Sequence, residues 1–159
     1  MTNGWGFFMK EKLIKCINEE RFFVARQMID EILLLSGSGR TSIYYIVENA
    51  IAYMRERYKE TLTLSQVAAC VGVTPNYLSK IFLQHVGVNF STYLNFLRVR
   101  EAEILLLKTE LQVTNISDAV GFTDTSYFIR VFKRYTHCTP TQFRYYYNSH
   151  KEEFLKNAH

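Results

Sequence analysis

Apolar residues recur at helical spacing in the first part of the chain. This periodicity predicts helix over residues 10–35, either as one helix or as two with a break near Asn18. The residues that carry the pattern are Leu13, Ile17, Val24, Met28 and Ile32. The next stretch, SGSGRTS (36–42), is rich in glycine and serine and predicts a flexible linker. We therefore expect residues 1–40 to form an N-terminal helical segment and a linker.

Beyond the linker, the pattern of apolar positions predicts helices almost without interruption. A long helix is expected at 43–58, a pair of shorter helices within 61–87, and a second long helix at 90–108. A similar pair of short helices is expected at 114–135, and a final short helix after Pro140. The low content of proline and glycine, two and seven residues in the chain, also favours helix.

The boundaries of the first helical pair are marked by residue type. Thr63 followed by Gln66 matches a capping box, so a helix is expected to begin there. Gly72 is expected to end it, because glycine adopts the left-handed backbone conformation without a steric penalty. Pro75 suits the first turn of the next helix, where no backbone N–H is needed.

The two helical pairs are copies of one supersecondary unit. At an offset of 50 residues, YLSKIF (77–82) aligns with YFIRVF (127–132). At an offset of 49, before a one-residue insertion in the second turn, Val67, Val71 and Gly72 align with Ile116, Val120 and Gly121. Each copy reads as helix, glycine turn, helix, which is the helix-turn-helix arrangement.

The same alignment separates a buried face from an exposed one in each copy. Ala68 and Ser117 are small enough for two helices to cross closely. The side chains expected in the core are Leu78, Ile81 and Phe82, and Phe128, Val131 and Phe132. The side chains expected to face outward are Asn76, Ser79, Lys80 and Gln84, and Thr125, Ser126, Ile129, Arg130 and Lys133. Short polar and basic side chains near a helix N-terminus suit the major groove of DNA.

Charge is concentrated in the second unit. The 159-residue chain carries a net charge of +4, from 19 Lys and Arg against 15 Asp and Glu. Between residues 121 and 147, Arg130, Lys133, Arg134 and Arg144 face Asp124 alone, which leaves that segment at +3. A modest excess of this kind permits a polyanionic partner.

The composition indicates no other chemistry. Cys16, Cys70 and Cys138 form no CxxC pair, so we expect no metal and no disulfide framework, and Cys70 is expected to be a buried thiol. This cysteine usage is typical of a reducing cytoplasm. No phosphate loop, nucleophile elbow or membrane-spanning run is present in the sequence, so we expect no enzyme, no cofactor and no membrane partner.

The run from Ile116 through SDAVGF, SYF, RVFKRY, TP and QFR to Arg144 resembles the signature of AraC/XylS-type transcription regulators. The resemblance covers residues 43–147. It implies an all-α domain of about seven helices, with two helix-turn-helix subdomains joined by a linker helix at 90–108. The domain would span residues 41–147, followed by a tail at 148–159.

The resemblance also implies a DNA-binding role for particular residues. Its recognition helices correspond to residues 75–86 and 124–136, which would enter successive major-groove segments about 10 base pairs apart. The positions that match base-reading positions are Asn76, Ser79, Lys80, Thr125, Ser126, Ile129 and Arg130. The positions expected at phosphates are Thr63, Gln84, Asn115, Lys133 and Arg134. The implied partners are double-stranded DNA and RNA polymerase.

Two positions depart from the family pattern. His137 stands where the family usually has glycine, and it would have to adopt a left-handed backbone. Ile129 is apolar at a reading position, where it would either touch a thymine methyl group or read nothing. The second unit is therefore expected to make fewer specific base contacts than the first.

Several alternatives stay open at this point. The segment LIKCINEERFFVARQMIDEIL is reminiscent of helices that precede this domain in response regulators of the family, and it would also suit homodimer formation. A helical protein-interaction module, or a truncated regulator that pairs through residues 13–35, is the alternative to a DNA reader. For Arg98 and Arg100, salt bridges with Glu101, Glu103 or Asp118 are favoured over DNA contact.

Overall fold

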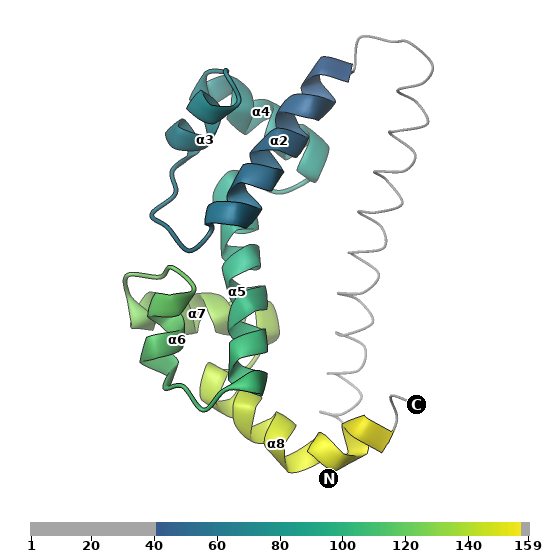
Figure 1. Ribbon diagram of the computed structural model, residues 1–159, viewed down its shortest axis with the longest axis vertical. Coiled ribbons are helices and arrows are strands. Elements are labelled where there is room, and N and C mark those ends of the chain that lie inside the picture. The colour runs from purple at the N-terminus through teal and green to yellow at the C-terminus, as the bar shows by residue number, and fades with distance from the viewer. Residues whose placement is uncertain (1–40, 157–159) are drawn as a thin grey trace. The chain divides into compact units, whose positions relative to one another are not determined.

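The computed structural model describes residues 41–156 of the chain. Within that range the chain forms seven α-helices and no strand, which confirms the all-α prediction. The helices are α2 (Thr41–Arg57), α3 (Leu64–Cys70), α4 (Pro75–Val86), α5 (Phe90–Lys108), α6 (Val113–Ala119), α7 (Thr125–Thr136) and α8 (Pro140–Lys156) (Figure 1). The described residues from Tyr45 onward belong to one compact unit. The helix expected over 10–35 and its linker lie outside the described residues.

The helix starts follow from capping residues that the sequence displays. Thr63 and Gln66 form the predicted capping box at the start of α3, with the Thr63 backbone N–H donating to Gln66 Oε1 at 2.8 Å. Pro75 occupies the first turn of α4, as predicted. The start of α7 is set by Asp124, whose carboxylate accepts from the Tyr127 backbone N–H at 2.7 Å. Such caps satisfy N–H groups that have no partner inside the helix.

Helices α4 and α7, the second helix of each unit, end in the same way with different residues. At the end of α4, Gly87 adopts φ 82°, and at the end of α7, His137 adopts φ 61°. His137 is the only non-glycine residue with positive φ among the described residues. The left-handed conformation expected there is confirmed, at a backbone cost of about 1–2 kcal/mol.

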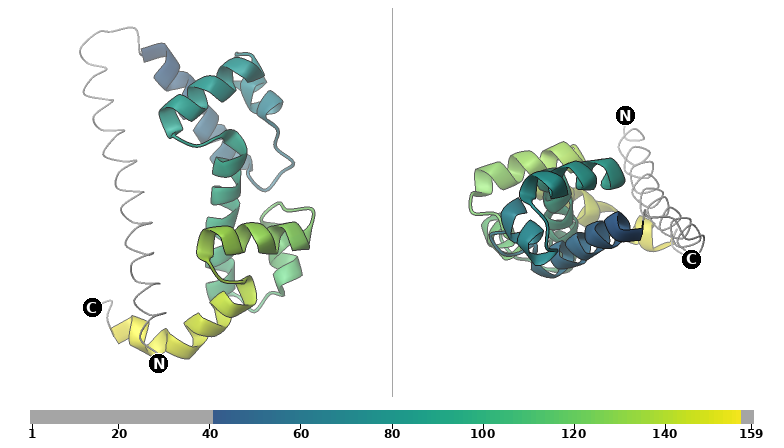
Figure 2. Two further views of the ribbon diagram at one scale, coloured as in Figure 1. Left: turned by 180° about the vertical axis from the view of Figure 1, so that it is seen from behind. Right: turned by 90° about the horizontal axis from the view of Figure 1, so that it is seen from above.

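Helix α5 connects the two helix-turn-helix units. It packs against α4 of the first unit and against α6 and α7 of the second, and α8 closes the second unit against it (Figures 1 and 2). Tyr135 on α7 ties the second unit to α5, because its hydroxyl donates to the Thr92 carbonyl oxygen at 2.8 Å. The expected linker helix at 90–108 is confirmed with the same bounds.

The core of each unit is built from the predicted face of its second helix. Leu78, Ile81 and Phe82 are buried on α4, and Phe128, Val131 and Phe132 are buried on α7. Burial of each of these side chains stabilises the fold by about 1.5–3 kcal/mol. Ala68 and Ser117, the two small residues, are fully buried, which confirms close helix crossing in both units.

Two expectations are wrong. The final helix is not short: α8 runs for 17 residues, because no glycine or second proline interrupts it after Pro140. The Cys70 thiol is not buried, since Cys70 is exposed at the end of α3. The buried side of α3 is formed by Val67 and Ala68. At 3.6 residues per turn, Cys70 lies beside Val67 on the side away from Ala68, and its thiol is therefore at the edge of the buried side.

Among the helices that the structure describes, none combines the length and the apolar character needed to cross a membrane.

Candidate nucleic-acid interface

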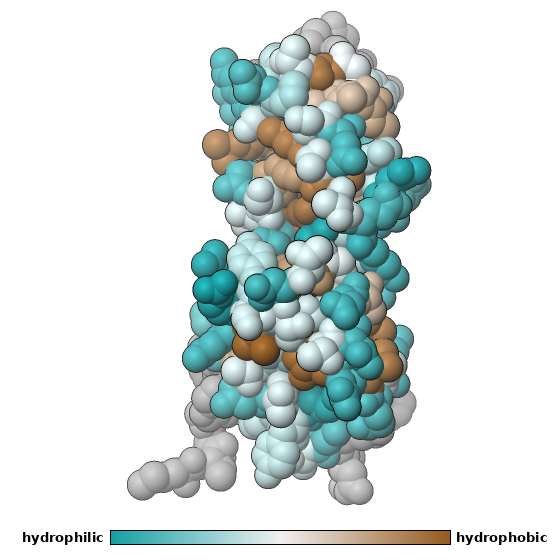
Figure 3. All heavy atoms as spheres, turned by 90° about the vertical axis from the view of Figure 1, so that its left-hand side faces the viewer, coloured by the Kyte–Doolittle hydropathy of each residue, from teal (hydrophilic) through white to brown (hydrophobic). Residues whose placement is uncertain are grey.

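Helices α4 and α7 lie on the same side of the linker helix. In the left-hand view of Figure 2, α7 crosses in front of α5, and α4 lies beyond the upper end of α5, in front of α2. Both α4 and α7 begin on the side of α5 that forms the left-hand edge of Figure 1, where α3 and α6 also lie. The fold therefore presents the first turns of both helices to one side, which is the face shown in Figure 3.

That face is mainly polar. Figure 3 shows hydrophilic and weakly polar residues over most of it, with apolar residues in small separate groups. Single apolar residues of this kind are normal on a protein surface. A mixed polar face suits a hydrated partner such as the DNA groove better than a dry protein interface.

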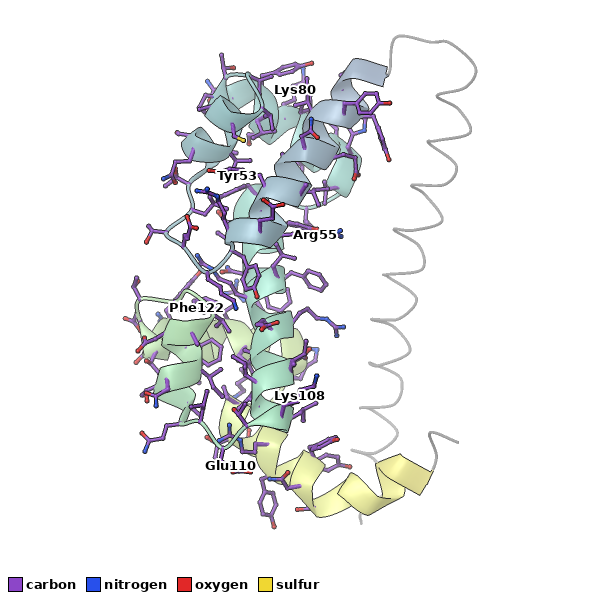
Figure 4. All side chains as sticks on the ribbon, in the orientation of Figure 1. Tyr53, Arg55, Lys80, Lys108, Glu110 and Phe122 are labelled. Carbon is purple, nitrogen blue, oxygen red and sulfur yellow. The ribbon has the colours of Figure 1, made fainter. Side chains whose placement is uncertain are left out.

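The first unit exposes every residue that was predicted to read bases. Asn76, Ser79 and Lys80 are all exposed on the first two turns of α4. Lys80 lies on the first subdomain, away from the junction with the second (Figure 4). The amide of Asn76 and the ammonium of Lys80 are therefore free of the core and can donate to base edges.

The second unit exposes only part of its predicted set. Ser126 and Arg130 are exposed, whereas Thr125 and Ile129 are half-buried. The guanidinium carbon of Arg130 lies 5.9 Å from the centre of the Tyr127 ring. This is within the range of a cation–π contact, which at an exposed site contributes about 0.5–1 kcal/mol.

The residues predicted to contact phosphates lie on α4 and α7 and at the starts of α3 and α6. Gln84, Asn115, Lys133 and Arg134 are exposed. Thr63 is exposed too, but its hydroxyl lies 2.9 Å from Gln66 Oε1 and accepts from the Gln66 backbone N–H at 3.3 Å. The Thr63 hydroxyl is thus occupied by the capping box.

Sequence reasoning did not single out Tyr127 or Asn95. Tyr127 is 44% exposed between the two α7 residues Ser126 and Arg130, and Asn95 on α5 donates to its hydroxyl at 3.3 Å. The repeat contained a signal for this position, because Tyr77 is its equivalent on α4 and is 41% exposed. The two units therefore expose a tyrosine at matching positions in the first turns of α4 and α7.

Arg98 does not form the salt bridge expected of it. Its guanidinium donates to two backbone carbonyl oxygens in the loop between α2 and α3, those of Tyr58 at 2.7 Å and Glu60 at 2.8 Å. Burial lowers the pKa of Arg98 below its usual value, although an arginine remains charged in a protein. Arg100 does form one of the expected pairs, with Glu103 at 3.4 Å.

In the part of the chain that the structure describes, no group of three His, Cys, Asp or Glu residues is placed to hold a metal ion.

Comparison with known proteins identifies the family. A family model described as "Helix-turn-helix domain" matches residues 67–145. The uncharacterized HTH-type transcriptional regulator YijO of Escherichia coli is 38% identical over 101 residues, or 64% of this chain. The chain spans only 36% of the length of that relative.

Solved structures agree with this match. The C-terminal domain of AraT, a response regulator from Geobacillus stearothermophilus, is 36% identical with a TM-score of 0.60, and the alignment covers 62% of this chain and 83% of that one. A transcriptional regulator from Chromobacterium violaceum, described as having an AraC-type DNA-binding domain, is 28% identical with a TM-score of 0.60, covering 64% of this chain and 90% of that one. The chain therefore belongs to the AraC/XylS family of transcription regulators and carries that family's helix-turn-helix DNA-binding domain.

Proposed function

We propose that this domain reads two adjacent major-groove segments of double-stranded DNA with α4 and α7. The observation that carries the proposal is that the two repeated units direct the first turns of both helices to one side of α5 (Figure 2). Two recognition helices on one face contact DNA at positions about one helical turn apart, or about 10 base pairs. The chain acts by binding, and we assign it no catalytic step.

In the first unit, Asn76, Ser79 and Lys80 are the proposed base readers. An asparagine amide pairs with the adenine edge, and a lysine ammonium donates to guanine O6 and N7. All three side chains are exposed on α4, so no rearrangement of the core is needed for contact.

In the second unit, Arg130 and Ser126 are the proposed principal readers. Arg130 donates two hydrogen bonds to a guanine edge, and the Tyr127 ring keeps its guanidinium in place before DNA binds. Thr125 and Ile129 are half-buried, which supports a smaller role for them, with Ile129 limited to apolar contact with a thymine methyl group. The second unit therefore reads fewer bases than the first.

Affinity is proposed to come largely from phosphate contacts. Lys133 and Arg134 lie one turn beyond Arg130 and are exposed, and Gln84 and Asn115 are exposed on other helices. Cations at phosphates release counterions, so binding weakens steeply as salt rises. Thr63 contributes through the position of α3, since its hydroxyl is already used in the capping box.

The whole protein is proposed to be a transcription regulator of the response-regulator type. The support is that AraT, at 36% identity, is a response regulator whose C-terminal domain aligns with this chain. Contact with RNA polymerase and homodimer formation through residues 13–35 are proposals that rest on the family and on the sequence pattern. A protein that binds DNA must work in the compartment that holds the DNA. This is consistent with the cytoplasmic location that we expected from the cysteine usage.

The protein-interaction module is not favoured, because the family to which the chain belongs consists of DNA-binding regulators. Residues 13–35, which that alternative would use, lie outside the described residues.

The test is selection of random-sequence duplexes by the purified protein, followed by sequencing. Two short enriched motifs about 10 base pairs apart are expected from a bipartite reader. A single motif would show that only one unit reads sequence. No enrichment at any salt concentration would contradict the proposal and favour the protein-interaction module.

A further inference from the structure

We propose that a junction between the two helix-turn-helix units sets the spacing of the DNA motifs that the protein accepts. The subdomain junction consists of the α2–α3 loop (58–60), Arg98 on α5, and the second turn at Gly121 and Phe122. Arg98 and Gly121 are its positioning residues. This inference rests on the proposed reading of two DNA segments. It identifies the contacts that fix the position of α4 relative to α7.

The first part of the junction is the contact of Arg98 with both units. Its guanidinium binds the Tyr58 and Glu60 carbonyl oxygens at 2.7 and 2.8 Å, which anchors α5 to the loop of the first unit. The guanidinium carbon also lies 5.3 Å from the centre of the Phe122 ring, in the second unit. Phe122 lies at the end of the second unit that is nearest to the α2–α3 loop (Figure 4). One side chain therefore contacts both readers' units.

The second part is a direct backbone contact. Gly121 has φ 92°, and a Cβ atom placed on it would lie 2.6 Å from the Lys59 carbonyl oxygen and 2.9 Å from the Lys59 Cα. Both neighbours are backbone atoms, so neither can move aside as the end of a side chain would. Only a glycine at position 121 lets the turn of the second unit lie this close to the Lys59 backbone in the α2–α3 loop.

The internal repeat shows that this closeness is not a requirement of the turn. Gly72 occupies the equivalent position in the first unit with φ 72°, and a Cβ atom there would have no neighbour within 4 Å. The positive φ is shared by both turns, whereas the contact with another unit belongs to Gly121 alone. Gly121 thus has a second role that its counterpart lacks.

A fixed junction has a consequence for the DNA site. One added base pair moves the second motif by about 3.4 Å and turns it by about 34–36° around the helix axis. Two readers held as one body cannot follow that shift unless the DNA is deformed. The junction therefore converts protein rigidity into discrimination between spacer lengths.

The experiment measures the affinity of the full chain for sites with the selected motifs and spacers changed by one and two base pairs. For the native protein, a one-base-pair change is expected to weaken binding at least about fivefold, as a lost base contact does. Arg98→Ala is expected to reduce this penalty to less than about twofold while affinity for either half-site alone stays unchanged. If Arg98→Ala keeps the native spacer preference, the proposal is wrong.

Two further variants separate geometry from charge and from turn strain. Arg98→Lys keeps the positive charge but loses the planar fork that reaches two carbonyl groups, so it is expected to behave like the alanine variant. Gly121→Ala is expected to relax the spacer preference. The matched control is Gly72→Ala, which introduces the same backbone strain and is expected to keep the native spacer preference. Equal effects of the two glycine variants would contradict the role given to Gly121.

A measurement without DNA keeps the two proposals distinguishable. Spin labels at His85→Cys on α4 and Ala119→Cys on α6, with Cys16 and Cys70 changed to serine, report the distance between the units. A narrow distance distribution is expected for the native junction and a broad one for Arg98→Ala. If Arg98→Ala leaves the distance distribution unchanged, the proposed junction is wrong, whatever the result of the DNA-binding experiments. If the native distribution is narrow but the selection yields no pair of motifs, the proposed DNA reading is wrong, and with it the role of the junction in spacing.

Discussion

At the residue scale, the two units differ in the surroundings of the residues proposed to read bases. On α4, Asn76 and Lys80 are exposed side chains on an exposed helix start. On α7, Arg130 lies against the Tyr127 ring, and Tyr127 accepts a hydrogen bond from Asn95 on the linker helix. In the proposed reading, this contact would favour one position of the Arg130 side chain before DNA binds, and less side-chain entropy would be lost on contact.

Replacement of Arg130 by alanine is expected to weaken binding to the selected site by roughly 5- to 150-fold, because a bidentate guanine contact contributes about 1–3 kcal/mol. The loss should be largest when the second motif is intact and small on scrambled DNA. Fluorescence anisotropy titrations on both duplexes measure it. If affinity and salt dependence were both unchanged, Arg130 would have no role at the interface.

Lys133→Ala is expected to behave differently, since Lys133 is assigned to a phosphate. Binding should weaken on all sequences by a similar factor, and the slope of log affinity against log salt should fall by about one. Titrations at four or more salt concentrations give the slope. A sequence-dependent loss would instead identify Lys133 as a base reader.

At the element scale, each recognition helix depends on the residue that caps it. The Asp124 carboxylate accepts from the Tyr127 backbone N–H at 2.7 Å, and Thr74 accepts from the Tyr77 backbone N–H at 3.3 Å. These caps fix the first turns of α7 and α4, where the proposed base readers begin. Helix stability and reader position are therefore linked at the same residues.

Asp124→Ala should lower the free energy of unfolding by about 1 kcal/mol, within the usual range of about 0.5–2 kcal/mol for a lost cap. Asp124→Asn, which keeps an oxygen acceptor, is the matched control and should lose much less. Urea unfolding followed by circular dichroism measures both. Equal losses in the two variants would mean that the charge of Asp124, and not the cap, is what stabilises α7.

At the scale of the whole described unit, long-range hydrogen bonds and burial join the two helix-turn-helix units to α5. Burial raises the pKa of Tyr93 and of Tyr135 above the usual tyrosine value of about 10. A raised pKa in the folded state means that the folded protein holds these protons more tightly than the unfolded chain. The associated stability is present below about pH 10 and is lost as the pH rises further.

Tyr135→Phe is expected to reduce stability at neutral pH by about 0.5–1.5 kcal/mol, because the hydrogen bond to the Thr92 carbonyl oxygen is lost. The same variant should lose less of its remaining stability between pH 9 and pH 11 than the native protein. Tyr145→Phe, at a tyrosine that is 75% exposed, is the control and should change neither quantity. Denaturant unfolding across this pH range measures both effects.

Much of the fold could be predicted because its causes are local. Features of this kind depend on residues within one or two helical turns. They include the capping box at Thr63, the glycine turn at Gly72, Pro75 at a helix start and the buried face of α7. The repeat added the equivalence of the two units, and with it the residues that would face outward. Ile129 was the doubtful reader in the sequence, and the structure places it half-buried.

What the sequence by itself determined, then, is the set of helices, their inner and outer faces, and the family signature. The tertiary structure alone decided which distant residues meet. The partners of Arg98 lie 40 and 38 positions away in the sequence, and the Lys59 backbone that touches Gly121 lies in the other unit. Helix periodicity carries no information about such pairs, because each depends on how completed helices pack around α5. The spacing of α4 and α7, the two proposed reading helices, is therefore a property of the folded chain and not of either repeat.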